Sequence, residues 1–441
     1  MKKKQVILLA AMFAGGLALV QAQDSGTIVQ GGNLAEKLEW LNVFSKSATS
    51  YVIELNTNES RGGSFTYGGK SGITVTIRGI DENRTIRGVL RVGSGTILVL
   101  DNNITVQGRV VVDNGGTLIM NSGTTVTGSN DSGVIVREKG MFTMNGGEIY
   151  GNKAEYGGGV WLDSNAIFTM NGGTISGNTV YEGGGGVYVD SNATFTMSGG
   201  TISGNAARSR YNSENGGGVY VIGTFTMSGG TISGNTAGRF GGGVFVTTIG
   251  GTFIMNDGEI SGNTVTGNPS RGGGVSVDNK GTFTMNDGNI SGNSSQSGGG
   301  VSVRDSGTFT MKKGTISGNT AIQGAGVDVG VDVGQATFTM SGGTISGNIA
   351  STSGGGINVW AGQGIFTKTG GTIYGYSESD TANNNVVKND TNEILKLRGH
   401  AVYAGSANTL LKIRESTAGP GNNMAFNGRV RPPTASGAWD N

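Results

Sequence analysis

The sequence predicts an all-β protein, a single-stranded parallel β-helix or β-solenoid of roughly twelve coils. Phenylalanine opens nearly the same short phrase nine times between Phe142 and Phe366, on average 28 residues apart. The same three short runs of residues recur with it, and glycine, 86 of 441 residues, falls at fixed places between them. A glycine content this high is typical of poorly folded chains when it is not periodic, so the periodicity favours an ordered repeat.

The repeating unit contains three pieces, which read GGGVYV at 216–221, TFTM at 224–227 and GGTISGN at 229–235. Each piece is rich in β-branched and aromatic residues, with alternating apolar positions and glycines between the pieces. This pattern indicates short strands joined by tight turns. Three such strands cannot bury a face alone, so we expect each strand to pair with its copies about 4.8 Å above and below.

Alternation along each strand assigns its inward and outward side chains. In TFTM, Phe195 and Met197 are expected to point inward and the threonines outward. In GVYV the valines point inward and Tyr188 outward, and Ile202 completes the interior. The inward methionines form a column: Met144, Met170, Met197, Met227, Met255, Met285, Met311 and Met340.

A second column is polar, because asparagine closes each phrase. An amide carries donors and an acceptor, so stacked asparagines are expected to bond from coil to coil at the corner of the solenoid. Regular spacing is what such a structural ladder needs, and it favours the ladder over a set of ligand-binding amides. Its members are Asn152, Asn178, Asn205, Asn235, Asn263, Asn293, Asn319 and Asn348.

The N-terminal segment predicts export. Residues 1–22 combine three lysines, an apolar run and small residues ending at Ala22, which is the pattern of a cleaved signal peptide. A retained membrane anchor is the alternative, but the run from Val6 to Val20 is short for a spanning helix. The mature chain is expected to lack a transmembrane segment and to be secreted or associated with the cell surface or outer membrane. With no cysteine, it has no disulfide staples.

Both ends of the solenoid need caps. We expect an N-terminal cap over 23–61, with a helix in which Asn33 and Glu36 form the N-terminal box and Leu34, Leu38, Leu41 and Phe44 face the first coil. The repeat domain is expected over 62–376. The ninth unit departs from the pattern, since Lys368 takes the methionine position and Tyr376 the asparagine position. A C-terminal cap and polar tail are expected over 377–441, with a last degenerate strand within 399–406.

The tandem GGGVYV and TFTMSGGTISGN units resemble secreted right-handed parallel β-helix repeat proteins of the pectin-lyase-like superfamily. They are similar in particular to repeat-rich surface proteins of spirochaetes and other host-associated bacteria. The resemblance implies a right-handed coil and covers roughly residues 62–375. Residues 95–128 fit it as degenerate coils, with Leu100 and Met120 in the methionine column.

The resemblance also makes an enzyme an alternative, because polysaccharide lyases and glycoside hydrolases share this superfamily. Such enzymes use stacked carboxylates with calcium and an arginine base, or paired carboxylates. Candidate carboxylates follow the GVYV strand, but the column is interrupted by Ile222 and Thr247, and Asp-Ser-Asn is ordinary turn chemistry. A single histidine excludes multi-histidine metal sites. We therefore expect no catalytic residues, metal or cofactor. The candidates are Asp163, Asp190, Asp278 and Asp305, together with Asp328 and Asp332 in the duplicated VDVGVDVG.

Binding surfaces have better support than catalysis. Four aromatic residues are predicted at the outward position of consecutive GVYV strands, where exposed rings form a platform for sugars. A ladder that only stabilises adjacent coils is the alternative interpretation. The long loop at 206–215 adds a predicted contact patch beside them. The predicted binding residues are Trp161, Tyr188, Tyr220 and Phe245 in the row, and Arg208, Arg210 and Tyr211 in the loop.

These observations predict a non-enzymatic, adhesin-like scaffold whose partner is carbohydrate or a host or extracellular surface. A formal net charge of +1, which becomes −2 without Lys2, Lys3 and Lys4, excludes a nucleic-acid partner, because no basic patch is present. The outward threonines of TFT leave ice binding as a remote third function, although β-propensity explains the same pattern.

Overall fold

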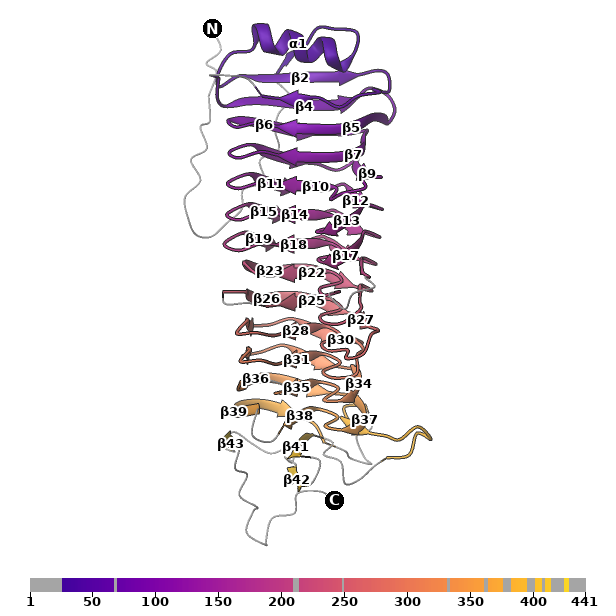
Figure 1. Cartoon of the computed structure of the whole chain (residues 1–441), viewed down its shortest axis with the longest axis vertical. Helices are drawn as coiled ribbons and strands as arrows, with labels where there is room; N and C mark the ends of the chain where they lie inside the picture. The colour runs from indigo at the N-terminus through magenta and orange to yellow at the C-terminus, as the bar shows by residue number, and fades with distance from the viewer. Residues whose placement is uncertain are drawn as a thin grey trace.

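The protein is a rod of stacked coils with one short helix at its N-terminal end, as the computed structural model shows (Figure 1). It is a parallel β-solenoid of about 12 turns, so the predicted fold class is confirmed. Residues 1–22, Arg210, Tyr211, Asp332 and Tyr376 lie outside the described residues. The structure describes residues 26–66, 70–208, 214–247, 250–330, 334–360, 364–375, 382–394, 401–406, 409–413 and 424–427.

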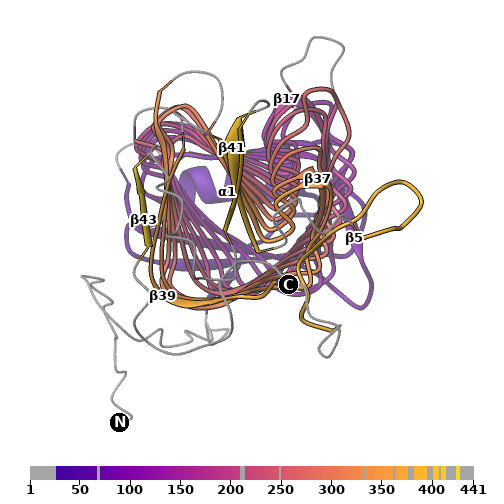
Figure 2. The same cartoon turned by 90° about the horizontal axis from the view of Figure 1, so that it is seen from below.

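The strands of each coil lie directly over those of the next, and the view along the rod shows them superposed (Figure 2). The GVYV-type strands form the first face: β10 (Val134–Val136), β14 (Val160–Leu162), β18 (Val187–Val189), β22 (Val219–Val221), β25 (Val244–Val246), β28 (Val275–Val277), β31 (Val301–Val303), β35 (Val327–Val329), β38 (Ile357–Trp360) and β41 (Val402–Ser406).

The TFTM-type and TIS-type strands form the other two long faces. TFTM-type strands are β6 (Thr96–Leu100), β8 (Thr117–Met120), β11 (Met141–Met144), β15 (Ile167–Met170), β19 (Thr194–Met197), β29 (Thr282–Met285) and β32 (Thr308–Met311). TIS-type strands are β9 (Thr124–Thr127), β12 (Glu148–Tyr150), β16 (Thr174–Ser176), β20 (Thr201–Ser203), β30 (Asn289–Ser291) and β33 (Thr315–Ser317). Four strands run through both: β23 (Thr224–Ser233), β26 (Thr252–Ser261), β36 (Ala336–Ser346) and β39 (Gly364–Ile373).

Short strands after the asparagine corner make two further small sheets that the sequence analysis did not predict. Strands of two to five residues follow most of the asparagines, and they pair in parallel with the same positions of neighbouring coils. These strands are β13 (Lys153–Tyr156), β17 (Thr179–Gly183), β21 (Ala206–Ala207), β24 (Thr236–Ala237) and β27 (Thr264–Val265), then β34 (Thr320–Gln323), β37 (Ile349–Ser353) and β40 (Val386–Val387).

The core consists of the predicted inward columns. Phe195 and Met197 are fully buried, and so are the equivalent residues of the neighbouring coils. Successive phenylalanine rings stack nearly parallel, with centroids 4.6 Å apart for Phe142 and Phe168 and 5.1 Å apart for Phe338 and Phe366. Identical residues therefore stack at the spacing of the strands, which explains why the phrase is repeated almost without change.

The N-terminal coils are built from longer strands and covered by helix α1 (Leu34–Phe44) (Figure 1). The Asn33 side chain accepts a hydrogen bond from the Glu36 backbone N–H at 3.0 Å, as the sequence predicts. Phe44 was expected to face the coil but is 57% exposed, because it is the last helical residue and packs beside Trp40. Lys37 is buried instead, and its ammonium donates to the Glu54 carbonyl. The strands are β1 (Thr27–Ile28), β2 (Ser50–Leu55), β3 (Ser64–Phe65), β4 (Ile73–Gly79), β5 (Arg84–Val92) and β7 (Ile104–Val112).

Parallel pairing runs past both ends of the expected 62–376 range. At the N-terminal end β2 pairs with β4, and at the C-terminal end β40 pairs with β37 and β41 with β38. Strands β42 (Thr409–Ile413) and β43 (Met424–Asn427) then pair antiparallel with β41 and β39. Among the described residues, none of the helices has the length and apolarity needed to cross a membrane.

Candidate functional site

One outward position of the first face forms a straight column along the rod, because the parallel register places equivalent residues over one another. Its first half is aromatic and its second half is polar. This change from aromatic to polar residues divides this side of the rod into two regions with different chemistry. From β14 to β38 the column reads Trp161, Tyr188, Tyr220, Phe245, Ser276, Ser302, Asp328 and Asn358.

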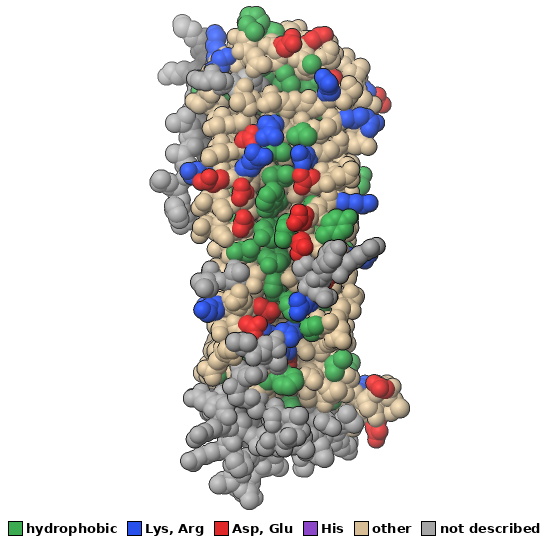
Figure 3. Space-filling model, in the orientation of Figure 1, with side chains coloured by type: hydrophobic (Ala, Val, Ile, Leu, Met, Phe, Trp, Pro, Cys, Tyr) green, Lys and Arg blue, Asp and Glu red, His purple; other side chains and the backbone are tan. Residues whose placement is uncertain are grey.

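The aromatic half includes two rings from the loops beside the column, Tyr156 and Phe240. Tyr188 lies between Tyr156 and Tyr220, with both ring centroids 5.1 Å away. Phe245 lies between Tyr220, at 5.0 Å, and Phe240, at 5.8 Å. A band of apolar side chains runs along this side of the rod (Figure 3). We call the six residues the aromatic strip: Tyr156, Trp161, Tyr188, Tyr220, Phe240 and Phe245.

The predicted row is present in the expected register, but the prediction of four exposed rings on a flat platform was wrong. Phe245 is only 4% exposed, because Tyr220 and Phe240 pack against it. Trp161, Tyr188 and Tyr220 are half-buried. Tyr188 and Tyr220 stack at an interplanar angle of 27°, so each ring turns one face toward its neighbour rather than toward a ligand.

Glycine at position 183 makes this packing possible. A Cβ atom there would lie 2.4 Å from Cδ2 of Tyr220, closer than any real side-chain contact. The Tyr220 ring therefore lies directly on the backbone of the preceding coil. Sequence reasoning about turns alone does not reveal this role of Gly183, because the ring comes from the next repeat.

Two polar atoms at the strip have no hydrogen-bond partner in the described part of the chain. They are the indole Nε1 of Trp161 and the Oδ1 of Asn215, and both atoms are buried. Asn215 is next to the strip, because its backbone bridges to Gly183 and to Phe240. A buried donor or acceptor without a partner costs about 1–3 kcal/mol, so the packing of the strip is maintained at that cost.

Four carboxylates lie beside the first rings of the strip. Asp163 and Asp190 follow β14 and β18, whereas Glu155 and Glu182 belong to β13 and β17. Acidic side chains lie on both sides of the apolar band (Figure 3). Asp163 and Asp190 each accept a hydrogen bond from the backbone N–H of the following serine, at 2.8 and 2.6 Å.

This arrangement affects the tyrosine hydroxyls. Burial, followed by the charges of Glu182 and Glu155, raises the pKa of Tyr156. Burial raises the pKa of Tyr188 further, with Tyr220 and Asp190 adding to the effect. Burial raises the pKa of Tyr220 to about 12, with contributions from Tyr156, Asp278 and Glu182. The strip therefore keeps its hydroxyls protonated in a region of negative potential.

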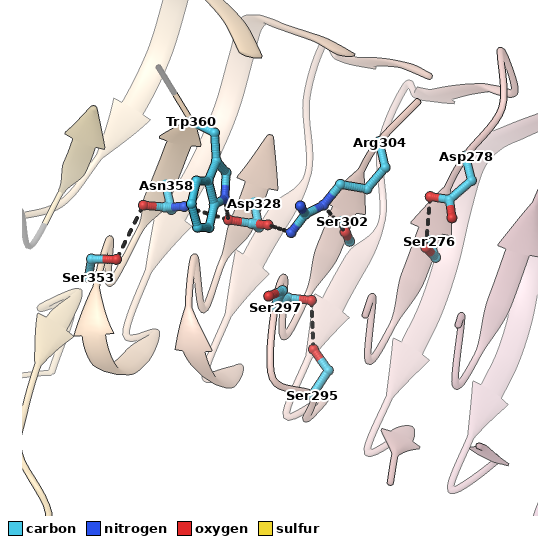
Figure 4. Close-up of polar contacts among 10 residues, drawn as sticks. All are labelled: Ser276, Asp278, Ser295, Ser297, Ser302, Arg304, Asp328, Ser353, Asn358 and Trp360. Atoms are coloured by element: carbon cyan, nitrogen blue, oxygen red, sulfur yellow. Dashed lines mark hydrogen bonds and ion pairs between the residues drawn. The ribbon is translucent and has the colours of Figure 1, made fainter. Parts of the chain in front are cut away.

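The polar half of the column and the side chains beside it form what we call the polar cluster: Ser276, Asp278, Ser302, Arg304, Asp328, Asn358 and Trp360 (Figure 4). The last five are joined by hydrogen bonds, whereas Ser276 and Asp278 bond to each other beside them. The Arg304 guanidinium forms an ion pair with Asp328, and the two side chains are 2% and 0% exposed. Asp328 also accepts hydrogen bonds from Asn358 Nδ2 at 2.6 Å and from Trp360 Nε1 at 3.2 Å. The sequence predicts these outward positions to face solvent, but the long side chains of Arg304 and Trp360 close over the small ones.

Asp278 is a buried carboxyl of the cluster with a strongly raised pKa. Burial raises its pKa to about 7, although the nearby Arg271 and Arg304 guanidinium groups oppose the shift. Its Oδ1 accepts a hydrogen bond from Ser276 Oγ at 3.3 Å. Asp278 is 5% exposed, so it does not offer a surface acid or base to a polymer. Among the described residues, no group of three or more His, Cys, Asp or Glu side chains is arranged to hold a metal ion.

The raised pKa of Asp278 predicts a pH-dependent stability. Its folded pKa, about 7, lies above the ordinary carboxyl value of about 3.9, so the folded state keeps a proton that the unfolded state loses between these values. Stability should therefore fall as pH rises from about 5 to 8, by a few kcal/mol. Denaturant unfolding of wild type and Asp278→Asn at both pH values checks this prediction. The free energy of unfolding of the variant should fall less between the two pH values than that of wild type. Equal losses in the two proteins would contradict it.

The asparagine column forms a continuous hydrogen-bonded ladder at one corner. Asn235 is typical: its Nδ2 donates to Asn263 Oδ1 at 3.0 Å and to the Ile202 carbonyl at 2.9 Å. Its Oδ1 accepts from the backbone N–H and the Nδ2 of Asn205. The ladder continues to Asn385, which the sequence analysis missed because the chain between Asn348 and Asn385 is longer than one repeat. Of the predicted loop residues, Arg208 is exposed directly after β21.

Comparison with known proteins agrees with this architecture. Residues 165–338 match the family model described as "Right handed beta helix region". This segment includes Tyr188, Tyr220 and Phe245 of the aromatic strip. No curated protein and no solved structure shows significant similarity to the chain.

Proposed function

We propose that this right-handed parallel β-helix repeat protein is a secreted or surface-exposed scaffold that binds glycans, adhesin-like and without catalysis, on its aromatic strip. The observation that carries the proposal is the half-buried row of Trp161, Tyr188 and Tyr220 beside a buried donor and acceptor without partners. The β-helix fold fits the pectin-lyase-like superfamily, but the fold alone does not fix a function.

The strip suits an extended ligand. Its residues come from four consecutive coils, so a linear polymer lying along the rod contacts several repeats at once. Sugars combine apolar ring faces with hydroxyl groups, and half-exposed tyrosine and tryptophan side chains match both.

The enzymatic alternative has weaker support. A lyase or glycoside hydrolase needs a base or paired carboxylates within reach of the substrate. The arginine and carboxylates with the most unusual environment, Arg304, Asp328 and Asp278, are buried in the polar cluster. The more accessible Asp163 and Asp190 lie four and three coils from the first coil of the cluster, and they are held in turns.

A glycan array followed by titration tests the proposal. We expect the full chain to bind one or more glycans, and Trp161→Ala or Tyr188→Ala to weaken binding at least about tenfold, which is about 1.4 kcal/mol. Trp161→Phe keeps an aromatic ring and should weaken binding less than Trp161→Ala does. Tyr150→Ala is the matched control, because Tyr150 is 42% exposed on the TIS face, away from the strip.

Unfolding midpoints of the variants separate lost binding from lost structure. Absence of binding to every glycan, or binding that the strip variants leave unchanged, would overturn the proposal. Cleavage of polygalacturonate or of a bound glycan would support the enzymatic alternative instead.

A further inference from the structure

The charges around the aromatic strip identify the chemistry of its ligand. Glu155, Glu182, Asp163 and Asp190 form no ion pair with any residue that the structure describes. Glu155 is exposed and the other three are partly exposed. Glu155, Asp163 and Asp190 each lie within two residues of a strip ring in the sequence. Glu182 lies six residues before Tyr188, and its charge acts on Tyr156 and Tyr220. The four carboxylates belong to two consecutive coils. Four carboxylates without an ion-pair partner among the described residues thus lie near Tyr156, Trp161 and Tyr188, where their charges attract a cation.

The same side of the rod shows the opposite pattern closer to the N-terminus. There, Asp113 pairs with both Arg91, at 2.8 Å, and Arg137, at 3.5 Å. Asp131 pairs with Arg109 in the same region. Arginines therefore neutralise the carboxylates up to the coil before Trp161, whereas the carboxylates on the coils of Trp161 and Tyr188 have no ion-pair partner among the described residues. The acidic segment is confined to the part of the column that has half-exposed rings.

At the Phe240 end of the strip, two arginine side chains of the protein itself lie over an aromatic ring. The guanidinium carbons of Arg239 and Arg271 lie 4.8 and 5.3 Å from the Phe240 ring centroid. Such contacts are electrostatic and contribute about 0.5–2 kcal/mol each. At Tyr156 and Tyr188 the rings and the negative charges are present, but among the described residues no equivalent cation is found.

From this charge complementarity we infer that the ligand of the strip is a glycan that carries protonated primary amines, that is, a polymer of amino sugars without N-acetyl groups. The inference rests on the proposed glycan-binding function. Amines of the polymer lie against the exposed edges of the tyrosine rings and pair with the four carboxylates. Polyanionic glycans such as polygalacturonate are repelled by the same carboxylates.

A lysine-rich peptide would fit the strip less well than a sugar polymer, because its backbone polar groups need hydrogen-bond partners. The strands beneath the strip are paired with both neighbouring coils, so a peptide cannot join them as an added strand. Its backbone polar groups would then rely on the few free groups of the strip. A sugar polymer has no such requirement, because hydroxyl groups that remain at the surface stay hydrated.

Titration of the full chain with two oligomers of equal length tests the inference. One is a β-linked glucosamine hexamer and the other its fully N-acetylated counterpart. At about pH 6, amines are protonated and carboxyls are ionised. We expect the amine oligomer to bind at least about tenfold more tightly, and this preference to shrink as salt rises.

The variant Glu155→Gln/Glu182→Gln should weaken binding of the amine oligomer about tenfold and leave that of the acetylated oligomer unchanged. Glu148→Gln/Glu259→Gln is the matched control, because both residues are exposed on the TIS face, and it should change neither. Equal binding of the two oligomers, still sensitive to Trp161→Ala, would overturn the inference and leave the glycan-binding function in place.

Failure of both oligomers, together with an empty glycan array, would overturn the proposed function itself. Tight binding of a lysine homopolymer, with no binding of the amine oligomer, would overturn the inference in favour of a peptide partner.

Discussion

Replacing Asp328 with alanine is expected to destabilise the protein by about 3–5 kcal/mol. The Arg304 guanidinium would remain buried without its ion-pair partner. Asn358 Nδ2 and Trp360 Nε1 would lose their acceptor as well. Denaturant unfolding, followed by circular dichroism, measures the loss.

A double variant isolates the cost of the unpaired charge. Arg304→Met/Asp328→Leu removes both charges and fills the space with apolar groups, so it should lose much less stability than Asp328→Ala alone. A single variant as stable as the double variant would show that Arg304 reaches solvent, which contradicts the buried network described above.

The second large effect is expected at the asparagine ladder. Asn235→Ala removes the acceptor of the Asn205 backbone N–H and the donor to the Ile202 carbonyl, and both groups are left without that partner in the interior. Each buried polar group without a partner costs about 1–3 kcal/mol, so the expected loss is about 3 kcal/mol or more. Asn235→Asp should be at least as damaging at neutral pH, because it also buries a charge.

A second asparagine row gives the matched control. Asn256 donates to Ser228 Oγ at 3.1 Å and accepts from Asn286 Nδ2 at 2.8 Å, but it is exposed. Because water replaces these partners, Asn256→Ala should cost less than about 0.5 kcal/mol. Equal losses for Asn235→Ala and Asn256→Ala would contradict the role assigned to the buried ladder.

The fold could be predicted from the sequence because its stability depends on a periodic pattern. Phe195 and Met197 lie between the equivalent residues of the coils before and after them, so every repeat needs the same residues at the same positions. The ladder could be followed from Asn152 to Asn348 for the same reason. Asn385 could not be found, because the insertion before it shifts the spacing, and spacing is the signal on which the prediction depended.

The candidate site could be predicted only in part. The register of Trp161, Tyr188 and Tyr220 follows from the repeat, but their burial depends on Tyr156, Phe240 and Gly183, which lie where the repeats differ. The sequence contains only a weak indication of the polar cluster, which is the change from aromatic to small polar residues in one column. Alternation along a strand gives the direction of a side chain, whereas burial also depends on side chains from adjacent positions.

Carboxyl footprinting tests the central claim, that ligand binds on the aromatic strip, most directly. The full chain would be labelled with a carbodiimide and an amine reagent, with and without the bound glycan, and the modified residues located by mass spectrometry. If ligand binds on the strip, it should protect Glu155, Glu182, Asp163 and Asp190 from labelling. The labelling of Glu148 and Glu259 should stay the same. Protection of Glu148 and Glu259 with unchanged labelling beside the strip would contradict it.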